Sequence, residues 1–104
     1  MKLSNIGDVI ASRSLMLNSD DGTKSEVLAL LGKPLQDGRD FYCPYQIKGA
    51  GDEKVRGSYG IDAIQALHLA IRNLGVEVEV LNKELGGKLR WESGDVADFG
   101  FPAI

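Results

Sequence analysis

The chain has 104 residues with a single cysteine, and its 15 acidic and 12 basic side chains leave a formal net charge of −3. A chain of this length forms one domain, residues 1–104, that can bury a core without disulfides. One cysteine cannot form an intrachain disulfide, which favours a reducing, cytoplasmic location. The acidic balance, without a cluster of lysine and arginine, argues against nucleic-acid binding. The longest apolar run, residues 27–31, is far too short to cross a bilayer, so no membrane contact is expected.

Residues 1–8 are polar and aperiodic, and we expect them to form a loose N-terminal arm. Beyond this arm, period-two alternation bounded by turn residues predicts four strands. These strands span residues 9–17, 25–31, 40–48 and 54–60. The links at residues 18–23 and 49–52 are of hairpin length, and turn residues are predicted again at 36–39. Short links of this kind predict antiparallel neighbours.

The third predicted strand has an apolar face formed by Phe41, Cys43, Tyr45 and Ile47. Pro44 lies on the other face. Because proline has no N–H to donate, Pro44 predicts an edge position, a bulge or an outward-pointing nitrogen at this point.

Residues 62–74 have the period of an amphipathic helix. Its predicted apolar stripe contains Ile64, Leu67, Ile71 and Leu74, with Ala63, Ala66 and Ala70 beside them. Asp62 followed by Gln65 resembles a capping box, and Gly75 is placed to end the helix at the C′ position. One helix packed on one face of a four-stranded antiparallel meander gives an α+β fold.

After the helix, the alternation of valine and glutamate predicts a strand at residues 76–80, although residues 81–85 fit a helical turn equally well. Gly86 and Gly87 break the chain, and a last short strand is predicted at residues 88–92. The apolar segment 99–104 is expected to pack back on the sheet or on a neighbouring subunit.

No catalytic constellation or metal-ligand set is recognisable in the sequence, and no cofactor is expected. His68, the single histidine, is predicted at the border of the apolar stripe, without a serine or cysteine nucleophile at a motif spacing around it. Cys43 is predicted to be a buried core residue, because a reactive thiolate needs cationic neighbours or a helix N-terminus. The sequence therefore favours a protein that is not an enzyme.

Four motifs stand in order along the chain: Asp37-Gly-Arg-Asp-Phe-Tyr-Cys-Pro-Tyr-Gln-Ile47, Gly60-Ile-Asp-Ala-Ile-Gln-Ala-Leu67, Leu89-Arg-Trp-Glu92 and Phe99-Gly-Phe-Pro102. Through them the chain resembles, between Ile10 and Pro102, a family of short, uncharacterised bacterial proteins described as a domain of unknown function. The resemblance implies a bacterial, stand-alone domain and carries over no catalytic residues. In fold class and charge the chain is also similar to immunity proteins, which neutralise toxins.

Two kinds of function remain open. The favoured one is a non-enzymatic protein-interaction module, with a homodimer or an unidentified protein as the partner. Its contacts are predicted on the outer side of the helix, at Gln65, Leu69 and Arg72.

The alternative is a small-ligand-binding domain or minor enzyme with a pocket between helix and sheet. The polar and aromatic residues predicted to line this pocket are Arg56, Tyr59, His68 and Trp91.

Overall fold

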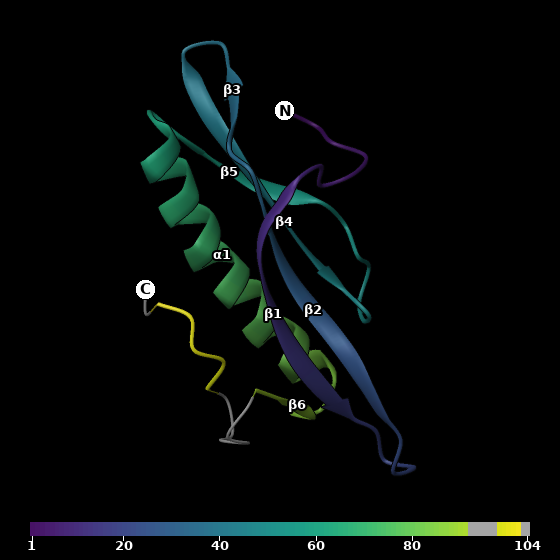
Figure 1. Cartoon of the computed structure of the whole chain (residues 1–104). Coiled ribbons are helices and arrows are strands. Elements are labelled where there is room, and N and C mark those ends of the chain that lie inside the picture. The colour runs from purple at the N-terminus through teal and green to yellow at the C-terminus, as the bar shows by residue number, and fades with distance from the viewer. Residues whose placement is uncertain (92–97, 103–104) are drawn as a thin grey trace.

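A computed structural model describes residues 1–91 and 98–102 of the chain. These residues form β1 (Val9–Asn18), β2 (Lys24–Gly32), β3 (Leu35–Asp37), β4 (Asp40–Lys48), β5 (Arg56–Gly60), α1 (Ala63–Glu84) and β6 (Leu89–Arg90). Figure 1 shows a long, twisted sheet with α1 lying across one face. The predicted α+β fold is confirmed.

The main strands follow one another across the sheet in the order β1, β2, β4, β5, and all neighbouring pairs are antiparallel. This is the predicted meander. Two short strands extend it: β3 pairs with the first residues of β4, and β6 pairs with β1 at Met16 and Leu17. The turn predicted at residues 36–39 is therefore shorter than expected, because its first two residues belong to β3. Three residues are too few to show an alternation in the sequence.

Pro44 lies in the interior of the sheet, so of the three predicted alternatives the edge position is wrong and a bulge agrees with the strand pairing. It pairs with Gly57 of β5 on one side. On its other side, β2 pairs with β4 only as far as Tyr45, and β3 begins its pairing at Tyr42. Residues 32–34 therefore oppose only residues 43–44, an irregularity of the bulge type. The missing N–H of Pro44 falls beside this interruption of the ladder.

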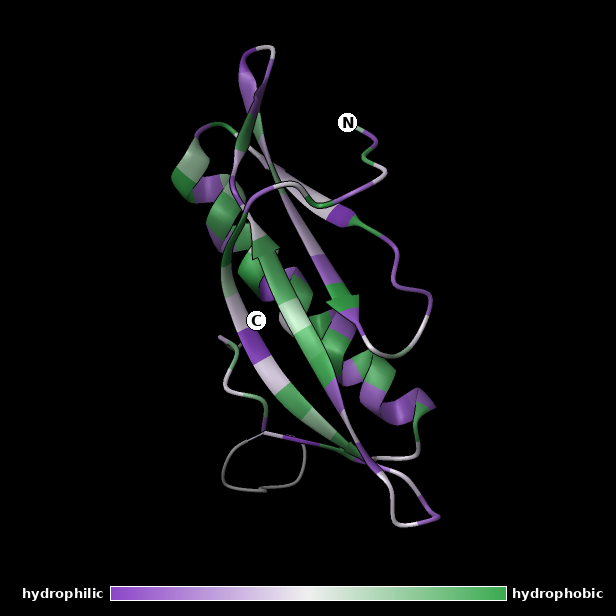
Figure 2. Cartoon of the chain, turned by 45° about the vertical axis from the view of Figure 1, so that its right-hand side comes forward, coloured by the Kyte–Doolittle hydropathy of each residue, from purple (hydrophilic) through white to green (hydrophobic). Residues whose placement is uncertain are grey.

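The hydrophobic core lies between α1 and the sheet face that carries the predicted apolar residues of β4. Cys43 and Tyr45 are buried, and Phe41 and Ile47 pack against them. Figure 2 shows the continuous apolar run of β2, which occupies the middle of the sheet. Because α1 crosses mainly β4 and β5, part of the core beside β1 is closed by Phe99 instead of the helix.

The strand predicted at residues 76–80 is wrong, because α1 continues without a break to Glu84. The alternation of valine and glutamate at residues 76–80 is locally compatible with either a strand or a helix. In the folded chain, however, the buried apolar side chains of this stretch are Leu74, Val78 and Leu81, with the four- and three-residue spacing of a helix. They extend the row begun by Ala66 and Ala70, so burial against the sheet favours the helix.

Gly75 does not end the helix, contrary to the prediction. It is buried inside α1, and a Cβ added at this position would lie 2.6 Å from the Cβ of Phe101. Its small size allows residues 98–102 to approach the helix closely. The helix ends instead at Glu84, with Leu85 as its C-cap, immediately before Gly86 and Gly87, both of which have positive φ angles.

The predicted apolar stripe of the helix also needs correction. Ile64 is 79% exposed, whereas Ala66 and Ala70 are fully buried. Alanine at the centre of the contact allows α1 to pack close to the sheet. In the described residues 1–91 and 98–102, no helix has the apolar length needed to span a bilayer.

Candidate functional site

The start of α1 is fixed by two reciprocal hydrogen bonds. Asp62 Oδ1 accepts from the Gln65 N–H at 2.8 Å, and Gln65 Oε1 accepts from the Ile61 N–H at 2.8 Å. These contacts match the predicted capping-box-like start, and loss of such a cap typically costs about 1 kcal/mol. The helix therefore presents a defined set of residues to its surroundings.

Eight side chains lie on the side of α1 turned away from the sheet: Gln65, His68, Leu69, Arg72, Val76, Glu79, Val80 and Lys83. We call this surface the outer face of α1. Val80 is 46% exposed, and Leu69 and Val76 are partly exposed. At 100° per residue, Leu69 and Val80 lie on one flank of Val76, whereas Arg72 and Glu79 lie on the other.

The three predicted partner-contact residues all belong to this outer face. Gln65 is exposed, although its side chain also takes part in the helix cap. Leu69 and Arg72 are partly buried. The Nε of Arg72 is buried and has no hydrogen-bond partner in the described part of the chain.

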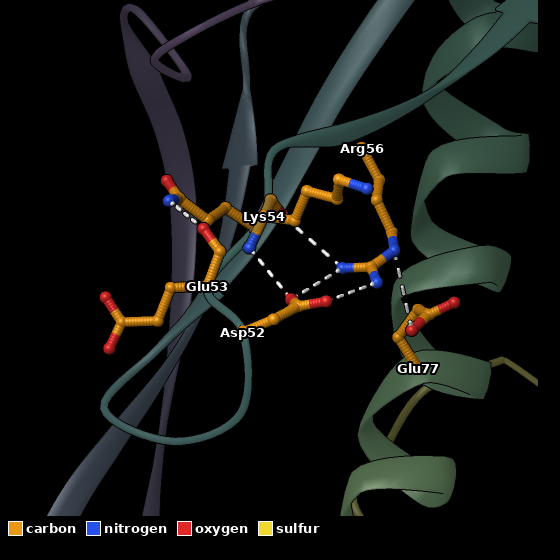
Figure 3. A network of polar contacts seen from close by, with 6 residues as sticks. Asp52, Glu53, Lys54, Arg56 and Glu77 are labelled. Carbon is orange, nitrogen blue, oxygen red and sulfur yellow. Dashed lines mark hydrogen bonds and ion pairs between the residues drawn. The ribbon is translucent and has the colours of Figure 1, made fainter.

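Arg56 forms the centre of a polar network between the β4–β5 loop and α1 (Figure 3). Its Nη1 and Nη2 groups donate to the carboxylate of Asp52 at 3.3 and 3.1 Å, and its Nε lies 3.8 Å from Glu77 of the helix. The hydrogen bonds between Arg56 and Asp52 raise the pKa of Arg56 and lower the pKa of Asp52. The network borders a cavity of about 180 Å³. Because Arg56 is held by two carboxylates, it links the loop to the helix.

A second cation, Arg13 of β1, lies against aromatic rings. Its guanidinium carbon is 4.3 Å from the centre of the Trp91 ring and 4.8 Å from that of Phe101. Its Nη1 donates to the Phe99 carbonyl oxygen at 2.9 Å. Stacking of this kind stabilises a guanidinium that is partly removed from water. Residues 98–102 are thus held against β1, which agrees with the first of the two predicted alternatives, packing on the sheet; residues 103–104 of the predicted segment lie outside the described residues.

Tyr59 lies on the sheet face away from α1. Its ring is 4.9 Å from that of Tyr42, and its hydroxyl donates to Asp37 at 2.9 Å. This hydrogen bond raises the pKa of Tyr59. Arg56 is three residues earlier on the same strand, so the two side chains point to opposite faces of the sheet.

The four residues predicted to line a pocket thus occupy different surroundings. Arg56 is in the loop–helix network, Tyr59 is on the opposite face, and Trp91 stacks on Arg13. His68 is exposed on α1. In the described residues, no hydrogen bond, ion pair or ring contact joins two of the four.

Sequence reasoning did not select Arg13 as a site residue. A signal was present, because the alternation of β1 places Arg13 between Ala11 and Leu15 on the face that turns towards the core. A cation on such a face needs a special environment. Its aromatic neighbours, however, come from a distant part of the chain and have no local signature.

The described residues contain no group of three or more His, Cys, Asp or Glu side chains arranged to hold a metal ion. Comparison of the chain with curated proteins and with solved structures returned no match in either case. A family model does match, over residues 11–103, and it is described as a domain of unknown function, DUF6968. Since this match covers nearly the whole sequence, the chain belongs to the DUF6968 family.

Proposed function

We propose that the protein is a self-associating interaction module and that its contact surface is the outer face of α1. The observation that supports this proposal is the row of Leu69, Val76 and Val80 on a side of the helix turned away from its own sheet. A single exposed apolar side chain is common on protein surfaces. Three at seven- and four-residue spacing match the seam along which two helices pair.

The partner that fits this surface is a second copy of the chain. In an antiparallel pair with its twofold axis level with residue 75 of each helix, beside Val76, Leu69 of each copy lies next to Val80 of the other. On the opposite flank, Arg72 of each copy lies next to Glu79 of the other. Apolar side chains therefore meet apolar ones, and each cation meets a carboxylate. A surface that is complementary to itself in this way suits a twofold dimer.

The expected affinity is modest. With 22 residues, α1 is about 33 Å long, so a single helix pair buries less than the roughly 800 Å² per partner of a standard interface. Dissociation constants on the order of micromolar are expected for such a contact.

Sedimentation equilibrium over a wide range of protein concentrations tests the proposal. Arg72→Glu and Glu79→Arg each place like charges opposite one another, and we expect each to weaken dimerisation by about tenfold or more. The double variant restores opposite charges and should recover most of the lost affinity.

The matched control is Lys24→Glu, a charge reversal at an exposed position on β2, which should leave the dimer unchanged. A protein that stays monomeric at all concentrations would contradict the proposal. So would a double variant that dimerises no better than either single variant.

A further inference from the structure

A cavity of about 190 Å³ lies where β1, β2 and α1 meet residues 98–102. Its walls are largely apolar and include Ala11, Leu31, Leu74 and Phe101. For comparison, an engineered apolar cavity of ~150 Å³ can hold benzene. The space is therefore large enough for a small organic molecule with one ring or a short branched chain.

Arg13 lines this cavity and supplies its charge. One of its five N–H donors is bonded to Phe99, and its guanidinium carbon lies over the rings of Trp91 and Phe101. Within residues 1–91 and 98–102, no carboxylate oxygen lies within 4.0 Å of its guanidinium. Arg56, by contrast, has two carboxylates close to it. With respect to the described part of the chain, Arg13 thus has donors left for an anion.

We propose that this cavity binds a small monocarboxylate with an apolar body of about six carbon atoms, such as an aromatic or branched aliphatic acid. Arg13 donates to the carboxylate, while the apolar body packs against Leu31 and Leu74. A planar guanidinium matches a carboxylate in geometry, and the apolar walls favour a ligand that removes them from water. Inorganic phosphate would leave those walls uncovered, and a long-chain fatty acid exceeds the available volume.

Titration of isotope-labelled protein with benzoate, followed by NMR, provides the test. We expect shifts in the methyl signals of Leu31, Ile71 and Leu74, with a dissociation constant on the order of 0.1–1 mM. Benzamide has nearly the same shape without the charge, and it should bind about tenfold more weakly. Inorganic phosphate should leave the three methyl signals unchanged.

Two variants locate the ligand. Arg13→Gln should weaken benzoate binding by about tenfold and leave benzamide binding unchanged. Ala11 is exposed at the cavity, so Ala11→Leu fills the space without disturbing a buried side chain and should abolish binding of both compounds. Ser14→Leu adds the same side chain to the opposite face of β1 and serves as the matched control.

The proposal is overturned if benzamide binds as tightly as benzoate, or if Ala11→Leu binds benzoate as well as the unmodified protein. The proposal is also overturned if benzoate at up to about 20 mM shifts none of the three methyl signals. If Arg13→Gln does not fold, the benzamide comparison and Ala11→Leu still decide the question. Binding here does not depend on dimerisation, because the cavity lies between α1 and the sheet, away from the outer face of α1.

Discussion

Cys43 occupies the centre of β4 with none of its surface exposed, and its thiol donates to the Gly32 carbonyl oxygen at 3.4 Å. Burial raises the pKa of this thiol from 9.0 to about 11, because a thiolate would lose its contact with water. Attack on reagents requires the thiolate. The prediction of an inert core cysteine is therefore supported by both burial and ionisation.

The raised pKa has a consequence for stability at alkaline pH. The folded state holds the Cys43 proton more tightly than the unfolded state. The protonated thiol therefore makes its full contribution to the free energy of unfolding below pH 9, and this contribution is lost as the pH rises through about 11. Two pKa units correspond to about 2–3 kcal/mol. We expect the unmodified protein to lose about this much stability relative to Cys43→Ala between pH 8 and pH 11, as measured by urea denaturation.

Tyr42 and Tyr45, whose pKa values burial also raises, titrate in both proteins and cancel in the comparison. A stability difference that is the same at both pH values would contradict the assignment of the shift to Cys43.

At the scale of elements, the second half of α1 is a helix in the structure, whereas its alternating sequence suggests a strand. Two valines in it respond differently to substitution in the two cases. Val78 is fully buried, whereas Val80 is 46% exposed. We expect Val78→Ala to destabilise the protein by about 1.5–3 kcal/mol, because it leaves a cavity in the core. Val80→Ala should change the stability by less than about 0.5 kcal/mol.

Both variants are compared by urea denaturation at a concentration where the protein is monomeric, so that any role of Val80 in dimerisation does not contribute. In a strand, Val78 and Val80 would share one face and respond alike. Equal losses for the two variants would therefore argue against the continuous helix.

The same region shows why sequence reasoning succeeds for some elements and fails for others. The four main strands are recognisable because glycine, asparagine and aspartate mark the turns between them. Between Gly75 and Leu85, the alternating pattern is compatible with a strand or a helix, and burial of Val78 and Leu81 against the sheet decides. Gly75 looks like a stop signal, but its role is to make room for Phe101.

The candidate site was less predictable than the fold. The outer face of α1 follows from the helical period, so Gln65, Leu69 and Arg72 could be selected from sequence. The aromatic environment of Arg13 could not, because it depends on where residues 98–102 lie in space. Residues of one site can be far apart in sequence. Residue type alone favours Arg56 and Tyr59 as neighbours in a pocket, but it ignores that their side chains point to opposite faces of the strand.

For the whole molecule, residues 98–102 complete the core that α1 leaves open beside β1. Phe99 is 4% exposed and packs in the main hydrophobic cluster, whereas Phe101 is partly exposed. We expect Phe99→Ala to reduce the free energy of unfolding by about 3–4 kcal/mol, and Phe101→Ala to have a smaller effect. Urea denaturation followed by Trp91 fluorescence measures both. A loss of less than about 1 kcal/mol for Phe99→Ala would mean that this segment is not part of the core.

The hydrogen bond between Arg13 and Phe99 joins residues 86 positions apart, and it sets an order for folding. Contacts of α1 with β4 and β5 close short loops, whereas docking of residues 98–102 on β1 closes nearly the longest loop in the chain. The short-range half of the domain is therefore expected to form first. During synthesis, β1 emerges early, but Arg13 on its core face lacks its hydrogen bond to Phe99 until Phe99 has left the ribosome. Through that interval, the first strand to be synthesised waits for Phe99, the buried apolar residue that comes latest in the described part of the chain.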